Sequence, residues 1–241
     1  MKQSKAIVSK IESFSTVDGP GIRTTIFFSK CNLRCKFCHN PEMWKQVGEE
    51  YTVDQLFNKI RKNKPYFKNN GGVTFSGGEP LLQSKFLIQL IEKLKKENIH
   101  ITIDTAGISD NCEEVIKNVD LVLLDIKHIN KEGYKDITQT DQFDKFNDFI
   151  KVLNKYNKKI WIRQVIIPDV NDNEEYLKGL TEYLEKINNI EKIEFLPFHT
   201  LGFKKYLDNN IKNPYHDKKA MDDKKCNILY EKFVKTQKKE Y

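Results

Sequence analysis

The chain has 241 residues, of which 39% are hydrophobic and 31% are charged. This length and apolar content suffice for a buried core and exclude a disordered chain, while no apolar run approaches the roughly 20 residues of a membrane-spanning helix. The first ten residues carry no apolar signal segment, which predicts a cytoplasmic protein, and the net charge of +7 comes from dispersed lysines rather than from a nucleic-acid-binding patch.

Stretches typical of strands and of helices alternate along the chain. Residues 24–28 (TTIFF) are β-branched and aromatic, which predicts a strand. Thr52 and Gln55 have the spacing of a capping box and predict a helix over 52–61. Further strands are predicted at 72–75, 99–103, 121–126, 160–167 and 193–198. Further helices are predicted at 84–96, 112–117, 143–153, 174–187 and about 222–236.

Six strands that are each followed by helical sequence predict an α/β fold with parallel strands. Six units fall short of the eight of a closed barrel, so we expect a partial (β/α)6 barrel or an open sheet. We expect residues 1–241 to form a single domain, with residues 1–20 flanking the barrel; residues 208–224 stay unassigned. The chemistry of parallel β/α folds lies at the carboxyl ends of the strands, which here are followed by residues 31–38, 76–79, 104–105, 125–127, 163–165 and 197–199.

Three of the five cysteines lie within eight residues, as Cys31-x3-Cys35-x2-Cys38. An odd number of cysteines argues against a disulfide framework, and clustered thiolates can hold one soft metal centre. A structural zinc site needs four ligands, and the only nearby fourth candidate, His39, adjoins Cys38 and would be cramped. An iron–sulfur cluster held by three cysteines leaves one iron open to a non-protein ligand. The spacing favours this open cluster over zinc and over cysteines that merely pack in the core.

The cysteine spacing, with Phe37 before the last cysteine, and the run Gly77-Gly78-Glu79-Pro80 together resemble the radical S-adenosylmethionine (radical SAM) superfamily. Within it, further segments resemble the family of pyruvate formate-lyase activating enzymes, in the right order over nearly the whole chain: 16–23 (TVDGPGIR), 38–40 (CHN), 104–105 (DT), 124–127 (LDIK), 161–163 (WIR) and 196–199 (LPFH). No cysteine lies between Cys38 and Gly77, so the ferredoxin-like insert of several other glycyl-radical activases is absent.

The resemblance implies a radical SAM oxidoreductase of anaerobic glucose metabolism that uses a [4Fe-4S] cluster and S-adenosylmethionine. In the family, reductive cleavage of S-adenosylmethionine gives a 5′-deoxyadenosyl radical, which abstracts hydrogen from a glycine of pyruvate formate-lyase. Two alternatives stay open: an activase of another glycyl-radical enzyme, and a radical enzyme that acts on a small molecule. A non-catalytic zinc or electron-transfer module is disfavoured because it would need a fourth ligand. We expect a monomer that receives its electron from an acidic flavodoxin or ferredoxin.

The resemblance also implies roles for individual residues. Cys31, Cys35 and Cys38 would hold the cluster. The residues implied in binding S-adenosylmethionine are Phe37, Cys38, His39, Gly78, Asp125, Ile126, Lys127 and His199; Arg163 is a further candidate, with packing as the alternative. A monovalent cation (sodium or potassium) would be held by Asp104, Thr105, the carbonyl of Leu123, and Asp125. Asp18 and Arg23 are expected to contact the glycine loop of the partner or, equally, to form a structural turn. Cys112 and Cys226 are expected to be inert.

Overall fold

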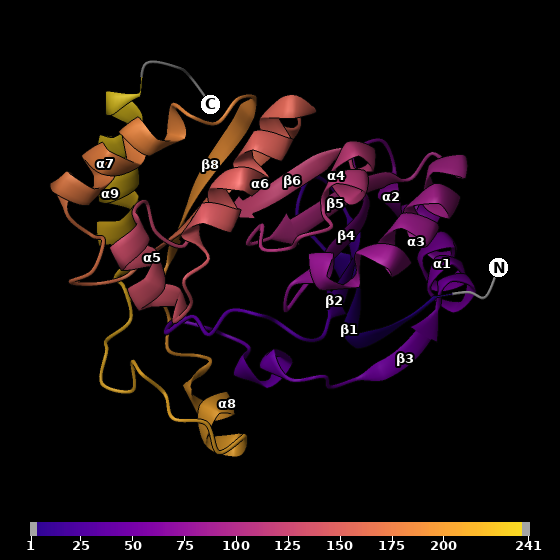
Figure 1. The fold of residues 1–241 in the computed structure, drawn as a ribbon, viewed down its shortest axis with the longest axis horizontal. Coiled ribbons are helices and arrows are strands. Elements are labelled where there is room, and N and C mark those ends of the chain that lie inside the picture. The colour runs from indigo at the N-terminus through magenta and orange to yellow at the C-terminus, as the bar shows by residue number, and fades with distance from the viewer. Residues whose placement is uncertain (1–3, 238–241) are drawn as a thin grey trace. The chain divides into compact units, whose positions relative to one another are not determined.

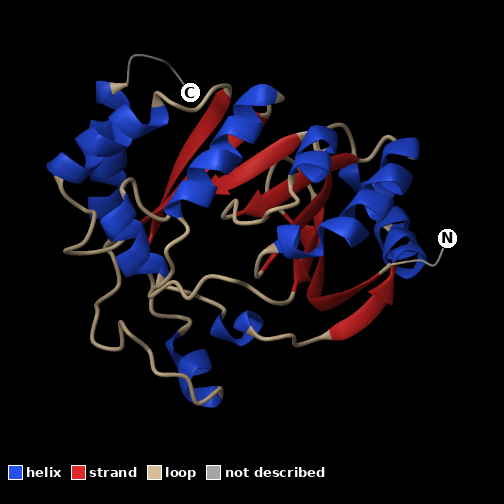
Figure 2. Cartoon of the chain, in the orientation of Figure 1, coloured by secondary structure: helices blue, strands red, loops and turns tan. Residues whose placement is uncertain are grey.

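The computed structural model describes residues 4–237, so residues 1–3 of the expected flanking segment lie outside the described residues. The chain divides into two compact units, each described here by itself. Unit 1 comprises Met1–Asn32 and Met43–Leu123, and unit 2 comprises Leu33–Glu42 and Leu124–Tyr241. Figure 1 follows the chain through both units, and Figure 2 separates helices from strands. Within the described part of the chain, no helix is both long and apolar enough to cross a membrane.

The strand order is β3-β1-β2-β4-β5-β6-β7-β8. All six predicted strands are present, as β2 (Arg23–Phe28), β4 (Gly72–Gly77), β5 (His100–Thr105), β6 (Leu121–Asp125), β7 (Lys159–Ile166) and β8 (Ile190–Pro197). In unit 1, β2 pairs in parallel with β4 and β4 with β5; in unit 2, β7 pairs in parallel with β8. The predicted α/β class with parallel strands is therefore confirmed.

Two further strands make the sheet mixed rather than wholly parallel. β1 (Lys5–Ser15) pairs antiparallel with β2, and β3 (Glu49–Thr52) pairs antiparallel with β1. Most of the segment expected to flank the barrel is thus a strand of unit 1. The sequence does not alternate at its start, because Ala6, Ile7 and Val8 are consecutive apolar residues, although only Ala6 and Val8 are buried. Two register shifts interrupt the β1–β2 ladder, and beyond the first one the alternation of burial fades.

The helices of unit 1 are α1 (Val53–Lys62), α2 (Lys64–Phe67), α3 (Ser84–Lys96) and α4 (Glu113–Asn118), with a short 3-10 turn η2 (Pro80–Gln83). The predicted capping box is confirmed: Thr52 accepts from the backbone of Gln55, whose side chain accepts from the backbone of Thr52. The apolar residues of α3 recur at helical spacing and are buried. In Figure 1, α1 and α4 lie beside α3, and both contact it. The 3-10 turn η1 (Pro41–Trp44) spans the end of one unit and the start of the other.

The helices of unit 2 are α5 (Lys131–Thr138), α6 (Phe143–Lys155), α7 (Glu174–Leu184), α8 (Phe203–Asp208) and α9 (Asp223–Thr236). α9 packs on β8 through Phe233, whose ring centroid lies 5.0 Å from that of Phe195, and it also contacts α7 (Figure 1). The short helices α5 and α8 were not expected. α5 begins at Asn130, whose side chain accepts a hydrogen bond from the backbone of Gly133.

Candidate functional site

The cysteine-bearing loop follows β2, and its part in unit 2 is held by backbone hydrogen bonds. The amides of Arg34 and Lys36 donate to the carbonyl oxygens of Thr138 and Ile137, each at 2.9 Å, which ties the loop to the end of α5. The amide of Cys38 donates to the carbonyl of Cys35 at 3.0 Å. This bond closes a turn between two of the three cysteines.

The chemistry of the donor set fits an iron–sulfur cluster. None of Cys31, Cys35 and Cys38 forms a disulfide; Cys35 is buried and the other two are partly exposed. Thiolates are the protein ligands of such clusters. Among residues 4–237, no three His, Cys, Asp or Glu side chains are gathered as a ready metal site, so the fit rests on the thiols and their spacing. The remaining cysteines are buried elsewhere, Cys112 at the start of α4 and Cys226 in α9.

Two predicted histidines meet in unit 2. The ring centroids of His39 and His199 lie 4.4 Å apart, with the rings edge to face. Burial lowers the pKa of His39, and the neighbouring His199 and Lys205 lower it further. Both histidines are exposed, and their edge-to-face rings offer a flat surface and a hydrogen-bonding edge, which suits a purine ring.

Lys127, Asp125 and Phe37 also come together in unit 2. The ammonium of Lys127 lies 2.8 Å from Asp125 Oδ2 and 5.3 Å from the centroid of the Phe37 ring. The amide of Ile126 donates to the carbonyl of Arg163 at 2.9 Å. Arg163 itself pairs with Glu194, Nε to Oε2 at 3.3 Å. This unit therefore presents an anchored cation beside an aromatic face, whereas the Arg163 guanidinium is bound to β8.

In unit 1, Gly77 and Gly78 bring β4 against the start of the cysteine-bearing loop. The amide of Gly78 donates to the carbonyl of Phe28 at 2.8 Å, and the amide of Glu79 donates to that of Lys30 at 2.9 Å. A Cβ on Gly78 would lie 2.3 Å from the carbonyl oxygen of Lys30, and Gly77 has a φ of +113°. Both positions require glycine, because a side chain would push the loop away.

The side chain of Glu79 joins the ends of β4 and β5. It is 0% exposed and accepts hydrogen bonds from the Thr105 hydroxyl at 2.6 Å and from the amides of Ala106 and Leu81 at 3.0 and 3.1 Å. Burial raises the pKa of Glu79 to about 7, which the three hydrogen bonds oppose and the negative charge of Asp104 reinforces. The sequence placed Glu79 at a strand end but gave no signal for this role, since its partners come from β5.

A pH-dependent contribution to stability follows from Glu79. Because its pKa is raised in the folded chain, the native state binds more protons than the unfolded state between pH 4.5 and about 7. Its contribution is full below pH 4.5 and falls by up to about 1.4 kcal/mol per pH unit as the pH rises through this window. Urea unfolding at pH 5, 6, 7 and 8 should therefore show a declining difference in stability between wild type and Glu79→Gln. A difference that does not change with pH would contradict the assignment.

Arg23 and Asp18 form a structural network at the opposite end of β2. Arg23 is 0% exposed and donates to Thr74 Oγ1 at 2.6 Å, Thr102 Oγ1 at 2.8 Å, Val73 O at 2.7 Å and Pro20 O at 2.9 Å. Burial lowers the pKa of Arg23 to about 10, against the raising effect of Asp18 and Asp120. Asp18 accepts from Ser15 and Thr25 at 2.6 and 2.8 Å. Direct contact of Arg23 with a partner does not fit this burial, whereas the structural-turn alternative does.

Tyr206 on α8 is a site residue that the sequence did not reveal. It is 1% exposed, and its hydroxyl donates to the carbonyl of Cys38 at 3.0 Å. Burial raises the pKa of Tyr206, and negative charge at Cys38 and Cys35 raises it further. The tyrosine therefore contacts the backbone of one predicted cluster ligand, Cys38. No motif includes it, because the contact spans 168 positions of the chain.

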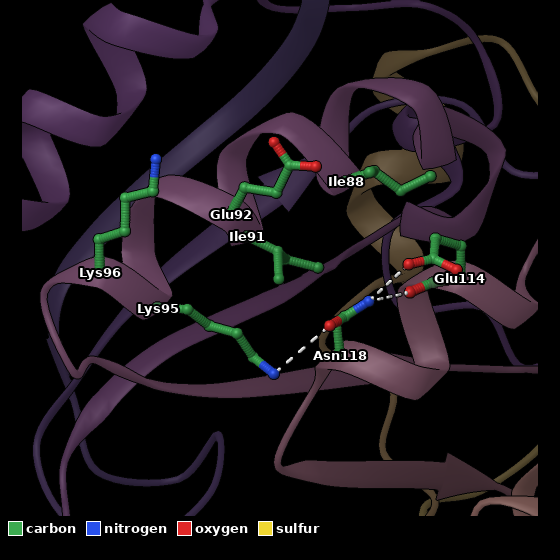
Figure 3. A pocket seen from close by; sticks show the side chains of 7 residues that line it. All are labelled: Ile88, Ile91, Glu92, Lys95, Lys96, Glu114 and Asn118. Atoms are coloured by element: carbon green, nitrogen blue, oxygen red, sulfur yellow. Dashed lines mark hydrogen bonds between the residues drawn. The ribbon is translucent and has the colours of Figure 1, made fainter.

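A surface pocket of about 320 Å³ lies between α3 and α4 in unit 1. Figure 3 shows its lining side chains, among which Asn118 bonds to Glu114 and to Lys95. None of the predicted site residues lines this pocket. It has mixed charge and few apolar side chains, so we assign it no part in the chemistry.

Comparisons with known proteins agree with the motifs and the fold. The model of the Radical SAM superfamily matches residues 25–184. A pyruvate formate-lyase-activating enzyme of Clostridium pasteurianum is 47% identical over 95% of this chain and 96% of the relative. One of Staphylococcus aureus (strain USA300) is 40% identical over 94% of each chain.

Solved structures give the same fold. A radical SAM methyltransferase from Sphaerobacter thermophilus matches with a TM-score of 0.64 and 15% identity over 88% of this chain and 63% of that chain. A methylornithine synthase matches with a TM-score of 0.60 and 12% identity over 91% of this chain and 64% of that chain. At such identities these two likenesses bear on the fold alone.

Proposed function

Since this chain belongs to the Radical SAM superfamily and, within it, to the family of pyruvate formate-lyase-activating enzymes, we propose that its substrate is one glycine of a pyruvate formate-lyase. The observation that carries this proposal is 47% identity over 95% of the chain to a pyruvate formate-lyase-activating enzyme. When bound, the [4Fe-4S] cluster and S-adenosylmethionine supply the one-electron chemistry, reductive cleavage to a 5′-deoxyadenosyl radical. The protein holds and orients these groups and keeps water away.

The thiolates of Cys31, Cys35 and Cys38 are proposed to hold the cluster and to leave one iron for the methionyl group of S-adenosylmethionine. The turn closed by the Cys38–Cys35 hydrogen bond supports this assignment, because it fixes the backbone that carries two of the ligands. The buried positions of Cys112 and Cys226 leave them to packing.

For S-adenosylmethionine, we assign the purine side to the Phe37, Cys38 and His39 segment together with His199. The edge-to-face imidazoles support it, since their faces and edges can contact a purine, and the lowered pKa of His39 favours its neutral form. Lys127 is proposed to orient a carboxylate or ribose oxygen, next to the backbone of Asp125 and Ile126. The backbone at Gly78 in unit 1 is proposed to receive the methionyl ammonium group.

A monovalent cation, sodium or potassium, is proposed to be held by oxygen atoms of Asp104, Thr105, Leu123 and Asp125. Hard oxygen donors suit such a cation. In unit 1, Asp104 is held by the Ser76 hydroxyl at 2.8 Å, and the Thr105 hydroxyl donates to Glu79, which leaves a lone pair free for a cation.

The cation assignment predicts that S-adenosylmethionine binds several-fold more weakly in buffer free of alkali cations and that Asp104→Asn weakens binding similarly. Isothermal titration calorimetry of the reconstituted protein in sodium, potassium and tetramethylammonium buffers measures the dissociation constant for S-adenosylmethionine. Ser109→Ala is the control, because its hydroxyl donates to the Leu81 carbonyl and belongs to none of the proposed ligands. The same affinity in all three buffers would contradict the assignment.

The remaining proposals concern partners and location. We propose an acidic flavodoxin or ferredoxin as the electron donor, because the chain has a net charge of +7 and opposite charges steer association. We also propose that the enzyme works in the cytoplasm as a monomer and that its two units act together as one radical SAM domain. Asp18 is kept as a proposed contact of the partner's glycine loop; Arg23 is not.

The test is an anaerobic activation assay. The protein is reconstituted with iron and sulfide, reduced, and mixed with S-adenosylmethionine and a pyruvate formate-lyase, and the sample is examined by electron paramagnetic resonance. We expect a glycyl-radical doublet that is absent when the radical glycine of the partner is replaced by alanine. Formation of 5′-deoxyadenosine without a doublet would indicate that the substrate is another glycyl-radical enzyme or a small molecule. Absence of cluster absorbance would contradict the proposal altogether.

A further inference from the structure

The start of α8 contacts the cysteine-bearing loop of unit 2 at several successive positions. The Tyr206 hydroxyl donates to the carbonyl of Cys38, and the Lys205 ammonium lies 3.0 Å from Glu42 Oε1 and also donates to Asn40 Oδ1. Gly202 lies so close that a Cβ would come 2.8 Å from the carbonyl oxygen of His39. Residues 202–206, here called the α8 contact, therefore bind the backbone and side chains of 38–42.

Tyr206 is the buried member of the α8 contact. It is 1% exposed, whereas the side chain of Lys205 is 36% exposed. A hydrogen bond in a buried place gains strength from the low local dielectric, and an acceptor that loses its donor there is costly. The bond from Tyr206 is therefore the contact of α8 with the loop that is best shielded from water.

The carbonyl that accepts the hydrogen bond from Tyr206 lies between two residues of the proposed site. It belongs to Cys38, a proposed cluster ligand, and it forms the peptide bond to His39, a proposed purine contact. Any rotation of that peptide unit changes the direction of the His39 ring. The amide of Cys38 is held separately, by its hydrogen bond to the carbonyl of Cys35. Loss of the Tyr206 bond should therefore disturb the Cys38–His39 peptide more than it disturbs the cluster.

We propose that Tyr206 is a positioning residue for S-adenosylmethionine, which holds the Cys38–His39 peptide in the orientation that binds the purine side of the cofactor. The inference rests on the proposed function of the site. Tyr206 acts through the loop and not on the reacting atoms. Its loss should therefore weaken cofactor binding and leave the rate at saturation nearly unchanged.

The experiment compares Tyr206→Phe with Tyr183→Phe. Tyr183 is a matched control, because it is 4% exposed, lies in the same unit and donates to Asn147 Oδ1 at 2.9 Å. For Tyr206→Phe we expect wild-type iron content, a dissociation constant and KM for S-adenosylmethionine raised about fivefold, and kcat within about twofold, on the scale of one lost hydrogen bond. For Tyr183→Phe we expect wild-type values of all of these quantities.

A second readout needs no cofactor. Amide hydrogen exchange in the full chain without cluster should be about fivefold faster over residues 38–42 in Tyr206→Phe than in wild type, and unchanged there in Tyr183→Phe. Gly202→Ala tests the same contact by adding a methyl group next to the carbonyl of His39. The methyl group should displace His39 and raise the dissociation constant for S-adenosylmethionine, as Tyr206→Phe does.

The outcomes separate the two claims. A wild-type chain that forms no cluster or binds no S-adenosylmethionine contradicts the proposed function, while faster exchange in Tyr206→Phe would still support the hold of α8 on the loop. A wild-type chain that binds the cofactor, with Tyr206→Phe equal to it in affinity and exchange, overturns the inference alone. Equal losses in Tyr206→Phe and Tyr183→Phe would also overturn it, since they would mark a general effect on folding.

Discussion

Cys35→Ala should abolish the cluster and, with it, the glycyl radical. The proposed site has only three protein ligands, so no other side chain can replace Cys35. The loss of metal affinity should therefore exceed the roughly 10–100-fold loss that follows removal of a residue that only hydrogen-bonds to a metal ligand. Cys35 is also the buried member of the cysteine motif, and its carbonyl closes the turn to Cys38. Iron content, visible absorbance and the glycyl doublet measure the three consequences.

Cys226→Ala and Cys112→Ala are the matched controls, because both residues are buried free cysteines outside the motif. Each should cost about 1 kcal/mol of stability through lost packing and leave iron content and radical yield unchanged. A cluster that survives in Cys35→Ala, or that disappears in Cys226→Ala, would reassign the ligands.

Arg23→Met should be the most destabilising single substitution in unit 1. Methionine fills part of the volume but removes every hydrogen bond of the guanidinium, which leaves the carbonyls of Val73 and Pro20 without their charged donor. Each buried acceptor left unsatisfied costs about 1–3 kcal/mol, so a loss of about 4 kcal/mol in the free energy of unfolding is expected. Urea denaturation of the full chain measures it.

Arg61→Met is the control, an exposed arginine near the end of α1 whose loss should change stability by less than about 0.5 kcal/mol. The same pair of variants decides between the two roles considered for Arg23. If Arg23→Met unfolds at the wild-type urea concentration but fails to activate the partner protein, the structural role is wrong and Arg23 is a contact of the partner protein.

Sequence patterns predicted the elements whose signal is local. β6 was predicted because the run Leu121–Leu124 is uniformly apolar, and these four residues are all buried. The N-terminal strand was missed because it has consecutive apolar residues at its start and its register shifts break the alternation that indicates a strand. α5 was missed because Gly133 and the β-branched Ile137 and Thr138 lower its helix propensity, so the helix depends on its Asn130 cap and on tertiary packing.

The same division applies to the site. The cysteine spacing and the glycine pair could be read from the sequence, because neighbouring residues supply the chemistry. Two of the three partners of Glu79 lie 26 and 27 positions away, and the partner of Tyr206 lies 168 positions away. No local pattern encodes such contacts. For Arg23 the sequence left a partner contact and a structural turn equally open, and its burial in the folded unit favours the structural turn.

The arginine network of unit 1 has a consequence for how the strands align. Thr25, Thr74 and Thr102 lie opposite one another on β2, β4 and β5, and Arg23 binds the last two. A slip of β4 by one residue would turn Val73 or Phe75 toward the guanidinium in place of Thr74 and would bury a charge against hydrocarbon. Misaligned sheets are thereby penalised during folding. The buried guanidinium of Arg23 thus favours the alignment that puts Gly77 and Asp104 at the carboxyl ends of their strands.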